Sequence, residues 1–304
     1  MAIIEVSQLQ KYYGEIKAVD GISFSVNEGE LFGFLGVNGA GKTTTINILS
    51  TLLSKTGGSV TVAGHELGRE RDDALIRRDI GIVYQQNCLD DILTVEENLL
   101  LRGYLFEQSR SKNRQKLTEV CEILSLGDLL GRRYGKLSGG QKRRCEIAAA
   151  LMHTPKLLFL DEPTTGLDPA TRLSVQNAVG KLREEMGMTV FLTTHYMEEA
   201  ANADNIVIID EGKVAAAGTP HELKERYTND TLRLYSHEVE RLIPMLDGCR
   251  ITKTAADCTE IEIKGTLSAL PILNSVQHLI TGYEVINGNM DSVFLNVTGK
   301  TLSI

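Results

Sequence analysis

A glycine-rich stretch in the first fifty residues has the pattern of a phosphate-binding loop. The residues from Gly36 to Thr43 read GVNGAGKT and fit G-x-x-x-x-G-K-[ST] in full. Glycines let the backbone wrap closely around phosphate oxygens, Lys42 can give a positive charge to the β- and γ-phosphates, and Thr43 can place its hydroxyl on Mg²⁺. The apolar segment LFGFL precedes this motif and a helical pattern follows it. This context favours a nucleotide site over a chance glycine turn.

Two adjacent carboxylates follow a short apolar segment later in the chain. The stretch LLFLDEP places Asp161 and Glu162 at the carboxyl end of an expected buried strand. Ligands of open α/β sheets bind at that end of the strands. We expect Asp161 to hold Mg²⁺ through its water shell and Glu162 to polarise an attacking water. Alone, the pair would fit a solvated loop better, but the complete phosphate-binding loop in the same chain disfavours that interpretation.

Two further strand ends carry polar residues that could reach the same edge of the sheet. Gln85 and Gln86 follow IGIV, and His195 follows TVFLTT. A glutamine there could contact Mg²⁺ or the attacking water. A single histidine is more often structural, but its position at a strand end favours a functional role.

A second glycine turn, LSGGQ, opens an apolar helical pattern at Ser138. Free backbone N–H groups and the helix dipole make such a turn a ready anion site. The helix to about His153 would span about 24 Å and lead into the strand that carries Asp161. We therefore expect the turn to serve a nucleotide on another copy. An ordinary capped start, with Ser138 and Gln141 as a capping box, is compatible with that role.

Alternating strands and helices must position these motifs. Apolar strand-like segments interleave with helical patterns, which favours an α/β domain with a parallel sheet. The pattern between about residues 88 and 153 is mainly helical. After residue 226 it changes to strand, helix, strand, strand, helix, strand, the order of a β-α-β-β-α-β unit. We expect domains at 1–226 and 227–304.

Composition restricts the class of protein. A net charge of −8 argues against a general nucleic-acid binder. The five cysteines are scattered and fit free thiols in a reducing cytosol. The N-terminus lacks a signal-peptide pattern, and no apolar run reaches the roughly 18–20 residues of a membrane span. We expect a cytoplasmic chain whose membrane work falls to a partner.

The order of all the motifs resembles the nucleotide-binding subunit of an ATP-binding cassette (ABC) transporter. YYG, GVNGAGKTT, VYQQ, LSGGQ, LLFLDEP, TGLD and TTH follow one another between residues 3 and 225. The resemblance implies a P-loop NTPase cassette of α/β class, with a parallel-sheet core, an antiparallel β subdomain and a helical subdomain, plus a small C-terminal α+β domain. It also implies ATP and Mg²⁺ as ligands and a head-to-tail dimer around two ATP molecules.

The same resemblance implies the roles of individual residues. Glu162 would be the catalytic base, His195 would contact the γ-phosphate, and Gln85 would contact Mg²⁺, with Gln86 as second choice. Tyr13 would stack on adenine, and Tyr12 is its less suitable neighbour. Mg²⁺ would be held by Thr43, Gln85 and Asp161. The implied nucleotide contacts are Tyr13, Gly36, Val37, Asn38, Gly39, Ala40, Gly41, Lys42, Thr43 and Thr44, together with Ser138, Gly139, Gly140, Gln141 and Asp168 facing the partner's site.

The residues near the end of the sequence indicate which branch of the family the chain resembles. NMDSVFLNVTGK, residues 289–300, resembles the ending of daunorubicin-resistance-type ATPases of bacterial exporters. That resemblance implies a peripheral subunit at the inner face of the membrane, a separate permease, and export of a drug, antibiotic, lipid or similar compound. Because the ATP motifs and the LSGGQ turn are all intact, we expect the second cassette to be an identical chain. Non-transport cassette ATPases are the alternatives: translation factors, DNA-repair ATPases and iron–sulfur assembly ATPases. The single cassette, the short distance between motifs and the C-terminal ending disfavour them.

Overall fold

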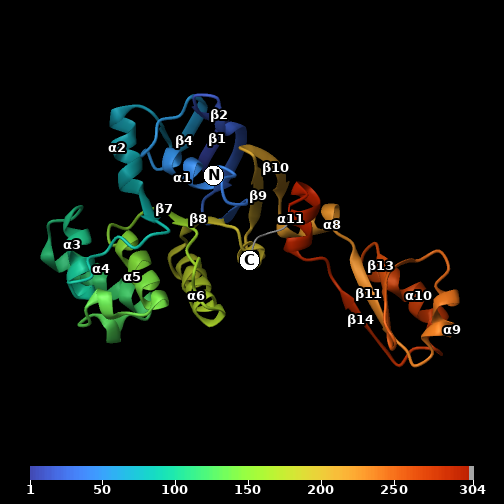
Figure 1. The fold of residues 1–304 in the computed structure, drawn as a ribbon. Helices are drawn as coiled ribbons and strands as arrows, with labels where there is room; N and C mark the ends of the chain where they lie inside the picture. The colour runs from blue at the N-terminus through green and yellow to red at the C-terminus, as the bar shows by residue number, and fades with distance from the viewer. Residues whose placement is uncertain (301–304) are drawn as a thin grey trace. The chain divides into compact units, whose positions relative to one another are not determined.

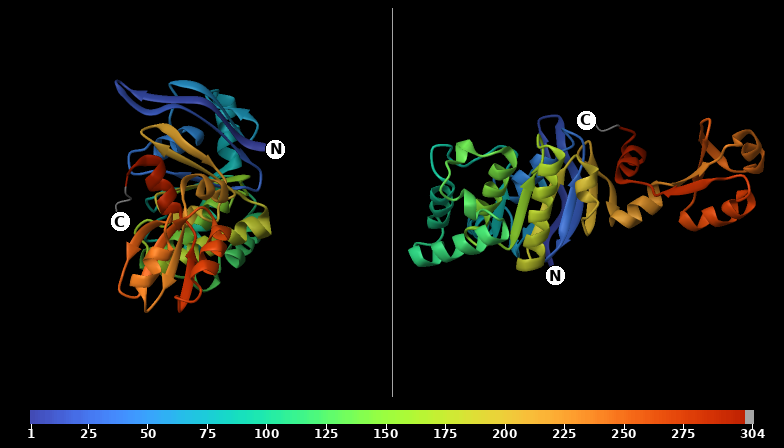
Figure 2. Two further views of the ribbon diagram at one scale, coloured as in Figure 1. Left: turned by 90° about the vertical axis from the view of Figure 1, so that its right-hand side faces the viewer. Right: turned by 90° about the horizontal axis from the view of Figure 1, so that it is seen from below.

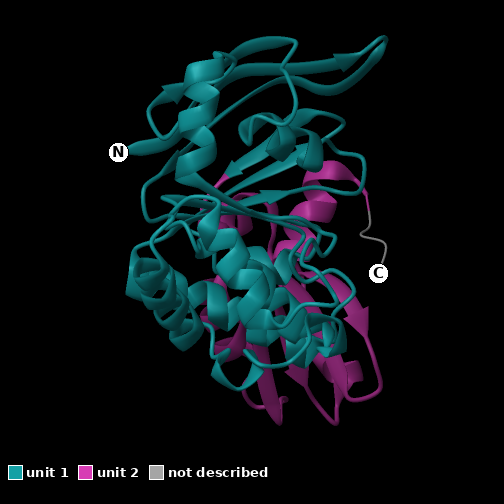
Figure 3. Cartoon of the chain, turned by 90° about the vertical axis from the view of Figure 1, so that its left-hand side faces the viewer, with its two compact units in different colours: residues 1–217 teal, residues 218–304 magenta. Residues whose placement is uncertain are grey.

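The computed structural model describes residues 1–300, and the chain divides into two compact units. Unit 1 is Met1–Ala217 and unit 2 is Gly218–Ile304 (Figure 3). The expected boundary after residue 226 falls at the end of helix α8 (Pro220–Tyr227). This helix packs against α11 (Met290–Thr298) and therefore belongs to unit 2, so the division lies before the helix rather than after it.

A six-stranded sheet forms the centre of unit 1. Its order is β10-β9-β3-β8-β7-β6, and the pairs β9–β3, β3–β8, β8–β7 and β7–β6 are parallel. The carboxyl ends of these parallel strands share one edge, which brings the motifs that follow them together. The strands are β3 (Leu31–Leu35), β6 (Ile80–Val83), β7 (Leu157–Asp161), β8 (Thr189–Thr194), β9 (Asn205–Asp210) and β10 (Lys213–Gly218).

An antiparallel sheet of order β2-β1-β4-β5 adds a second layer (Figure 1). Five phenylalanines, Phe24 of β2 with Phe32, Phe34, Phe159 and Phe191 of the central sheet, join the two sheets with ring centroids 5.3–6.1 Å apart. This aromatic core fixes the strand ends that carry the motifs. The elements are β1 (Ala2–Tyr13), β2 (Ile16–Asn27), β4 (Gly57–Val62), β5 (His65–Glu66), α1 (Lys42–Leu49) and α2 (Glu70–Asp79).

The expected helical region holds three helices that pack on one another, α3 (Val95–Tyr104), α4 (Arg110–Ile123) and α5 (Gly139–Leu151). They form one cluster in each view of the chain (Figures 1 and 2). Short 3-10 turns at Gly127–Leu129 and Tyr134–Lys136 lie between α4 and α5. The helix α5 ends two residues earlier than expected.

Two helices follow the carboxylate-bearing strand and its neighbour. Asp168 caps α6 (Pro169–Met186), Pro169 occupies its first position, and Gly187 ends it in the left-handed conformation. The short α7 (Met197–Ala200) follows β8. Within residues 1–300, no helix is both long and apolar enough to cross a membrane, α6 with its 18 residues included.

Unit 2 contains the expected β-α-β-β-α-β order. Its sheet has the antiparallel order β12-β13-β11-β14, and α9 and α10 lie on the same side of it (Figure 2). Leu232, Leu234, Ile261 and Ile263 point into the core under these helices. The elements are β11 (Asp230–Tyr235), α9 (Val239–Met245), β12 (Arg250–Thr254), β13 (Cys258–Ile263), α10 (Ala269–Val276) and β14 (Gly282–Ile286).

Candidate active site

The glycine-rich loop, Gln85 and Glu162 meet in one hollow of about 260 Å³ at the carboxyl edge of the central sheet. Segments that lie far apart in the sequence supply its wall, as the strand-end argument requires. The lining residues are Ala18, Asn38, Gly39, Gly41, Lys42, Thr43, Thr44, Gln85 and Glu162. Three of the four predicted motifs at strand ends therefore contribute directly to the wall.

The loop can adopt its shape only with glycine at particular positions. Gly41 has φ +108°, and a Cβ there would lie 2.5 Å from the Ala18 carbonyl oxygen. A Cβ at Gly36 would lie 2.6 Å from the Ile209 carbonyl oxygen. The helix α1 begins directly after Gly41, and no side chain among the described residues caps it. Its first N–H groups are therefore available to an anion such as a phosphate.

Glu162 lies opposite Lys42 at the base of the hollow. The Lys42 Nζ lies 3.1 Å from Glu162 Oε1, with side chains 4% and 9% exposed. Lys42 also donates to the carbonyl oxygens of Gly36 at 2.8 Å and Val37 at 3.2 Å. Burial acts to raise the pKa of Glu162, but Lys42 and His195 outweigh it, so the pKa is lowered. The carboxylate is therefore ionised and able to accept a proton from water.

The backbone at Glu162 is unusual. Its φ of +45° places a non-glycine residue in the left-handed region, which is a costly conformation found mainly at functional sites. The Glu162 N–H donates to the Thr193 carbonyl oxygen at 3.1 Å. This bond to β8 helps to hold the residue turned out of the strand β7 and into the hollow.

His195 contacts this carboxylate, and Asp161 precedes Glu162 at the end of β7. His195 Nδ1 lies 3.2 Å from Glu162 Oε2, so the predicted pair is brought together. Asp161 is buried and accepts a hydrogen bond from the Thr193 hydroxyl at 2.6 Å, outside the set of residues that line the hollow. The oxygen donors of Thr43, Gln85 and Asp161 are of the type that Mg²⁺ prefers.

The two tyrosines at the end of β1 differ in the hydrogen bonding and exposure of their side chains. The Tyr12 hydroxyl donates to Asp20 Oδ1 at 2.7 Å, and this bond raises the pKa of Tyr12. Tyr13 is 48% exposed, and the Lys11 ammonium lies 5.0 Å from its ring centroid. Its side chain does not line the hollow, but its ring is half exposed and is not tied by a bond to Asp20, so Tyr13 is the better candidate for stacking on a base.

The LSGGQ turn and Asp168 lie outside this hollow. Ser138 and Gln141 form the expected capping box at the start of α5, and Asp168 caps α6. A Cβ at Gly140 would lie 2.2 Å from Thr171 Cγ2, so the starts of α5 and α6 pack together. The structure thus does not bring these predicted contacts to the nucleotide loop of their own chain.

Three buried charged residues near the site carried no sequence-based prediction. Arg143 and Glu146 lie on α5 and bond the segment around Gln85, while Glu199 lies on α7. Glu199 accepts a hydrogen bond from the Thr164 hydroxyl, and burial raises the pKa of Glu199 to about 7. The glutamate inside the apolar pattern CEIAAAL is a signal that could have marked Glu146, whereas Arg143 lies in the charged run KRR and carries no such signal.

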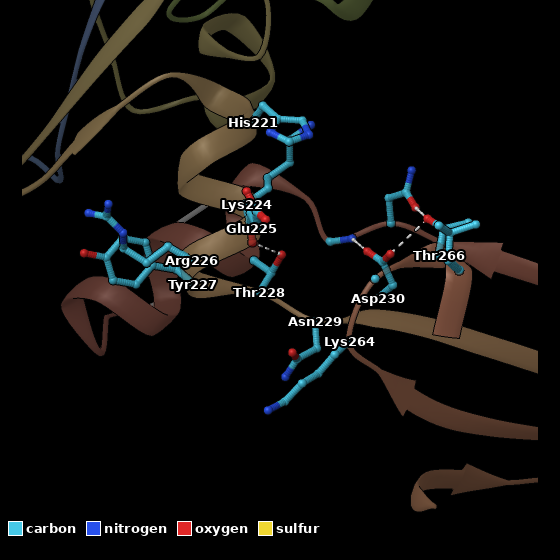
Figure 4. Close-up of a pocket in the computed structure, with 14 residues that line it drawn as sticks. His221, Lys224, Glu225, Arg226, Tyr227, Thr228, Asn229, Asp230, Lys264 and Thr266 are labelled. Carbon is cyan, nitrogen blue, oxygen red and sulfur yellow. Dashed lines mark hydrogen bonds between the residues drawn. The ribbon is translucent and has the colours of Figure 1, made fainter. Parts of the chain in front are cut away.

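A larger hollow of about 910 Å³ lies in unit 2, but its polar groups do not converge. In Figure 4, Arg226 and Tyr227 lie to one side of α8, whereas Lys264 extends from the sheet. Asp230 is occupied by the Gly288 N–H at 3.1 Å and the Thr266 hydroxyl at 3.2 Å. We assign this hollow no ligand.

Comparison with known proteins agrees with this geometry. The ABC transporter family profile matches residues 19–165. The chain is 40% identical to the daunorubicin/doxorubicin resistance ATP-binding protein DrrA of Streptomyces peucetius, over 97% of this chain and 92% of that protein. It is 38% identical to the linearmycin resistance ATP-binding protein LnrL of Bacillus subtilis, over 99% of both.

A solved structure shows the same cassette fold. This chain superimposes on the dimeric structure of a post-hydrolysis state of the ATP-binding cassette MJ0796, bound to ADP and Pi, with a TM-score of 0.64. The two are 30% identical, and the match covers 71% of this chain and 98% of the MJ0796 chain. The expected α/β cassette with its parallel core, antiparallel sheet and helical region is confirmed. The chain belongs to the ABC transporter family, as one of its ATP-binding and ATP-hydrolysing subunits.

Proposed function

We propose that two copies of this chain close head-to-tail around two ATP molecules and drive export through a separate membrane permease. The observation that carries the proposal is the LSGGQ turn, which opens helix α5 but lies outside the nucleotide hollow of its own chain. A second chain would supply the missing contact. ATP then favours the closed pair by its higher affinity for that state, and hydrolysis removes this preference.

Within each site, the chain's own residues divide the work. Glu162 would take a proton from the attacking water, and His195, 3.2 Å from that carboxylate, would orient the γ-phosphate. Mg²⁺, held by Thr43 and Gln85 and through water by Asp161, would supply positive charge to the phosphate oxygens. Tyr13 would stack on the adenine ring.

Lys42 would change partners during this cycle. In the structure its ammonium pairs with Glu162 at 3.1 Å. The β- and γ-phosphates are stronger partners for the same ammonium, so ATP would release the carboxylate for the water. The ion pair with Lys42 would thus keep Glu162 from acting as the base until ATP binds.

Export of a drug, antibiotic, lipid or similar compound is the transport reaction that we propose. The two relatives above are named for resistance to daunorubicin/doxorubicin and to linearmycin, and they match over nearly the whole chain. The segment after Gln85 offers an apolar contact for a permease at the inner face of the membrane, with Ile92 74% exposed. Affinity purification from membranes, followed by mass spectrometry, should recover one integral membrane protein with this chain.

The paired-site mechanism has a direct test. Glu162→Gln should bind ATP and form a stable dimer with little hydrolysis, measured by light scattering on a sizing column. Ser138→Arg in the same background should bind ATP and stay monomeric, because the bulky side chain blocks the turn. A tight ATP-bound monomer of the Glu162→Gln variant would contradict the two-chain site.

A further inference from the structure

Helix α5 carries a buried arginine that bonds two catalytic segments at once. Arg143 is 4% exposed. Its guanidinium donates to the carbonyl oxygen of Tyr84, the residue before Gln85, and to the carbonyl oxygen of Asp161, the residue before Glu162, at 3.1 Å. One planar fork therefore joins α5 to the backbone on which both catalytic side chains are mounted.

One turn further along α5, a buried glutamate holds the other end of the Gln85 segment. Glu146 is 6% exposed. Its Oε1 accepts hydrogen bonds from the backbone N–H groups of Cys88 at 2.8 Å and Leu89 at 3.0 Å, and from the Tyr134 hydroxyl at 2.7 Å. The segment 84–89 is thus bonded at both ends to side chains three positions apart, on one face of one helix.

These contacts connect the Gln85 and Glu162 segments to the helix that carries the LSGGQ turn. α5 begins at the LSGGQ turn, which in the proposed function contacts the ATP of the second chain. A helix moves nearly as a rigid body, and hydrogen bonds to buried charges are strong and costly to break. A shift of the turn would therefore reach residues 84–89 and 161 of the same chain through these bonds.

We propose that Arg143 and Glu146, which we call the α5 brace, are positioning residues. When the LSGGQ turn of a chain contacts the ATP bound by the second chain, the brace places Gln85 and Glu162 of its own chain in the geometry for hydrolysis. The inference rests on the proposed function, because it needs the second chain. The two ATP sites would in this way be coupled, so that each chain reaches its hydrolysis geometry only when its own turn is engaged.

Arg143→Lys tests the brace with little change in volume or charge. A lysine is a point donor and cannot fork between the two carbonyls. We expect the maximal ATPase rate to fall about 10- to 100-fold, the Hill coefficient for ATP to fall to 1, and the ATP concentration for half-maximal rate to stay within about twofold. Glu146→Gln, which keeps an acceptor for the two N–H groups, should lower the rate less.

Arg144→Lys is the matched control. Arg144 lies on the same helix but bonds the carbonyls of Leu124 and Ser125 within the helical cluster. Its rate and Hill coefficient should equal those of the wild type. In a Glu162→Gln background, Arg143→Lys should still form the ATP-bound dimer, because the turn itself is unchanged.

The outcomes separate the brace from the function on which it rests. A Glu162→Gln chain that binds ATP tightly and stays monomeric would overturn both. If the wild type dimerises cooperatively but Arg143→Lys keeps its rate and Hill coefficient, only the brace is wrong. Loss of the dimer in the Arg143→Lys, Glu162→Gln variant would also overturn it, since the defect would then lie in docking. Thermal melting and circular dichroism establish that each variant is folded.

Discussion

The pair between Lys42 and Glu162 predicts that one substitution weakens the empty protein and strengthens nucleotide binding. Glu162→Gln replaces a carboxylate 3.1 Å from a buried ammonium with a neutral amide. A hydrogen bond to a charged group contributes about 1.5–3 kcal/mol and a neutral one about 0.5–1.5 kcal/mol. The variant should therefore lose about 1–1.5 kcal/mol of unfolding free energy. For a unit of this size, the nucleotide-free Tm should fall by about 2–6 °C.

Nucleotide should cancel this loss, because phosphate replaces Glu162 as the partner of Lys42. The wild type must break the pair to bind, whereas the variant has already lost it. A difference of about 1–1.5 kcal/mol corresponds to roughly five- to tenfold tighter binding by the variant. Nucleotide-saturated melting temperatures should then be equal for the two proteins.

The measurement is isothermal titration with a non-hydrolysable ATP analogue and Mg²⁺, together with thermal melts. Both proteins should carry Ser138→Arg, so that dimer formation does not add to the affinity. Glu198→Gln, which neutralises an exposed acid two residues before Ala200, is the control and should change neither quantity. Equal affinity and equal nucleotide-free Tm for wild type and Glu162→Gln would refute the exchange of partners.

Three further substitutions test the loop, the stacking residue and a buried acid. Gly41→Ala should abolish ATP binding in a filter assay and lower the free energy of unfolding by more than about 1 kcal/mol, because φ is +108° and the added Cβ has no room. The control Gly64→Ala, also at positive φ but in open space, should keep ATP binding. Tyr13→Ala should weaken ATP binding by about 1–2 kcal/mol, the scale of base stacking, measured by titration, whereas Tyr12→Phe should not. Glu199 has a pKa raised to about 7 in the folded chain, so the folded state binds its proton more tightly than the unfolded state and stability falls as pH rises. Between pH 6 and 8 its contribution should fall by about 1.4 kcal/mol, and Glu199→Gln should remove that part of the pH dependence of denaturant unfolding.

Other charged groups near Glu199 affect its pKa and therefore the interpretation of the pH-dependence test. Arg172 of α6 and Arg143 of α5 act to lower the pKa of Glu199, while Glu162 and burial act to raise it. Lys181, Arg183 and Glu184 of α6 line a cavity whose wall also includes Glu199. Unchanged pH dependence in Glu199→Gln would assign the slope to one of these groups instead.

Motifs whose chemistry is local were predictable from the sequence. The glycine loop and the strand-end residues Glu162, His195 and Gln85 meet because parallel strands place their carboxyl ends at one edge. The order of elements in unit 2 also follows from pattern alone. These features depend on neighbouring residues or on a general rule of sheet geometry.

Features that depend on distant partners were not predictable. Arg143 bonds carbonyls of Tyr84 and Asp161, and no local pattern indicates those partners. Most residues of helix α2 are charged, and Ile76 is its single buried residue, so it shows no broad apolar stripe. The boundary between units was misplaced because α8 packs against α11, which lies at the far end of unit 2.

The open ring of Tyr13 gives this chain a convenient optical handle. The sequence contains no tryptophan, so Tyr13→Trp would be the only indole in the protein. The position is half exposed, and Lys11 lies over the native ring. Emission from a single indole there would report the arrival of a nucleobase without background. The residue that we propose to stack on the base could thus be used to time nucleotide binding in the purified chain.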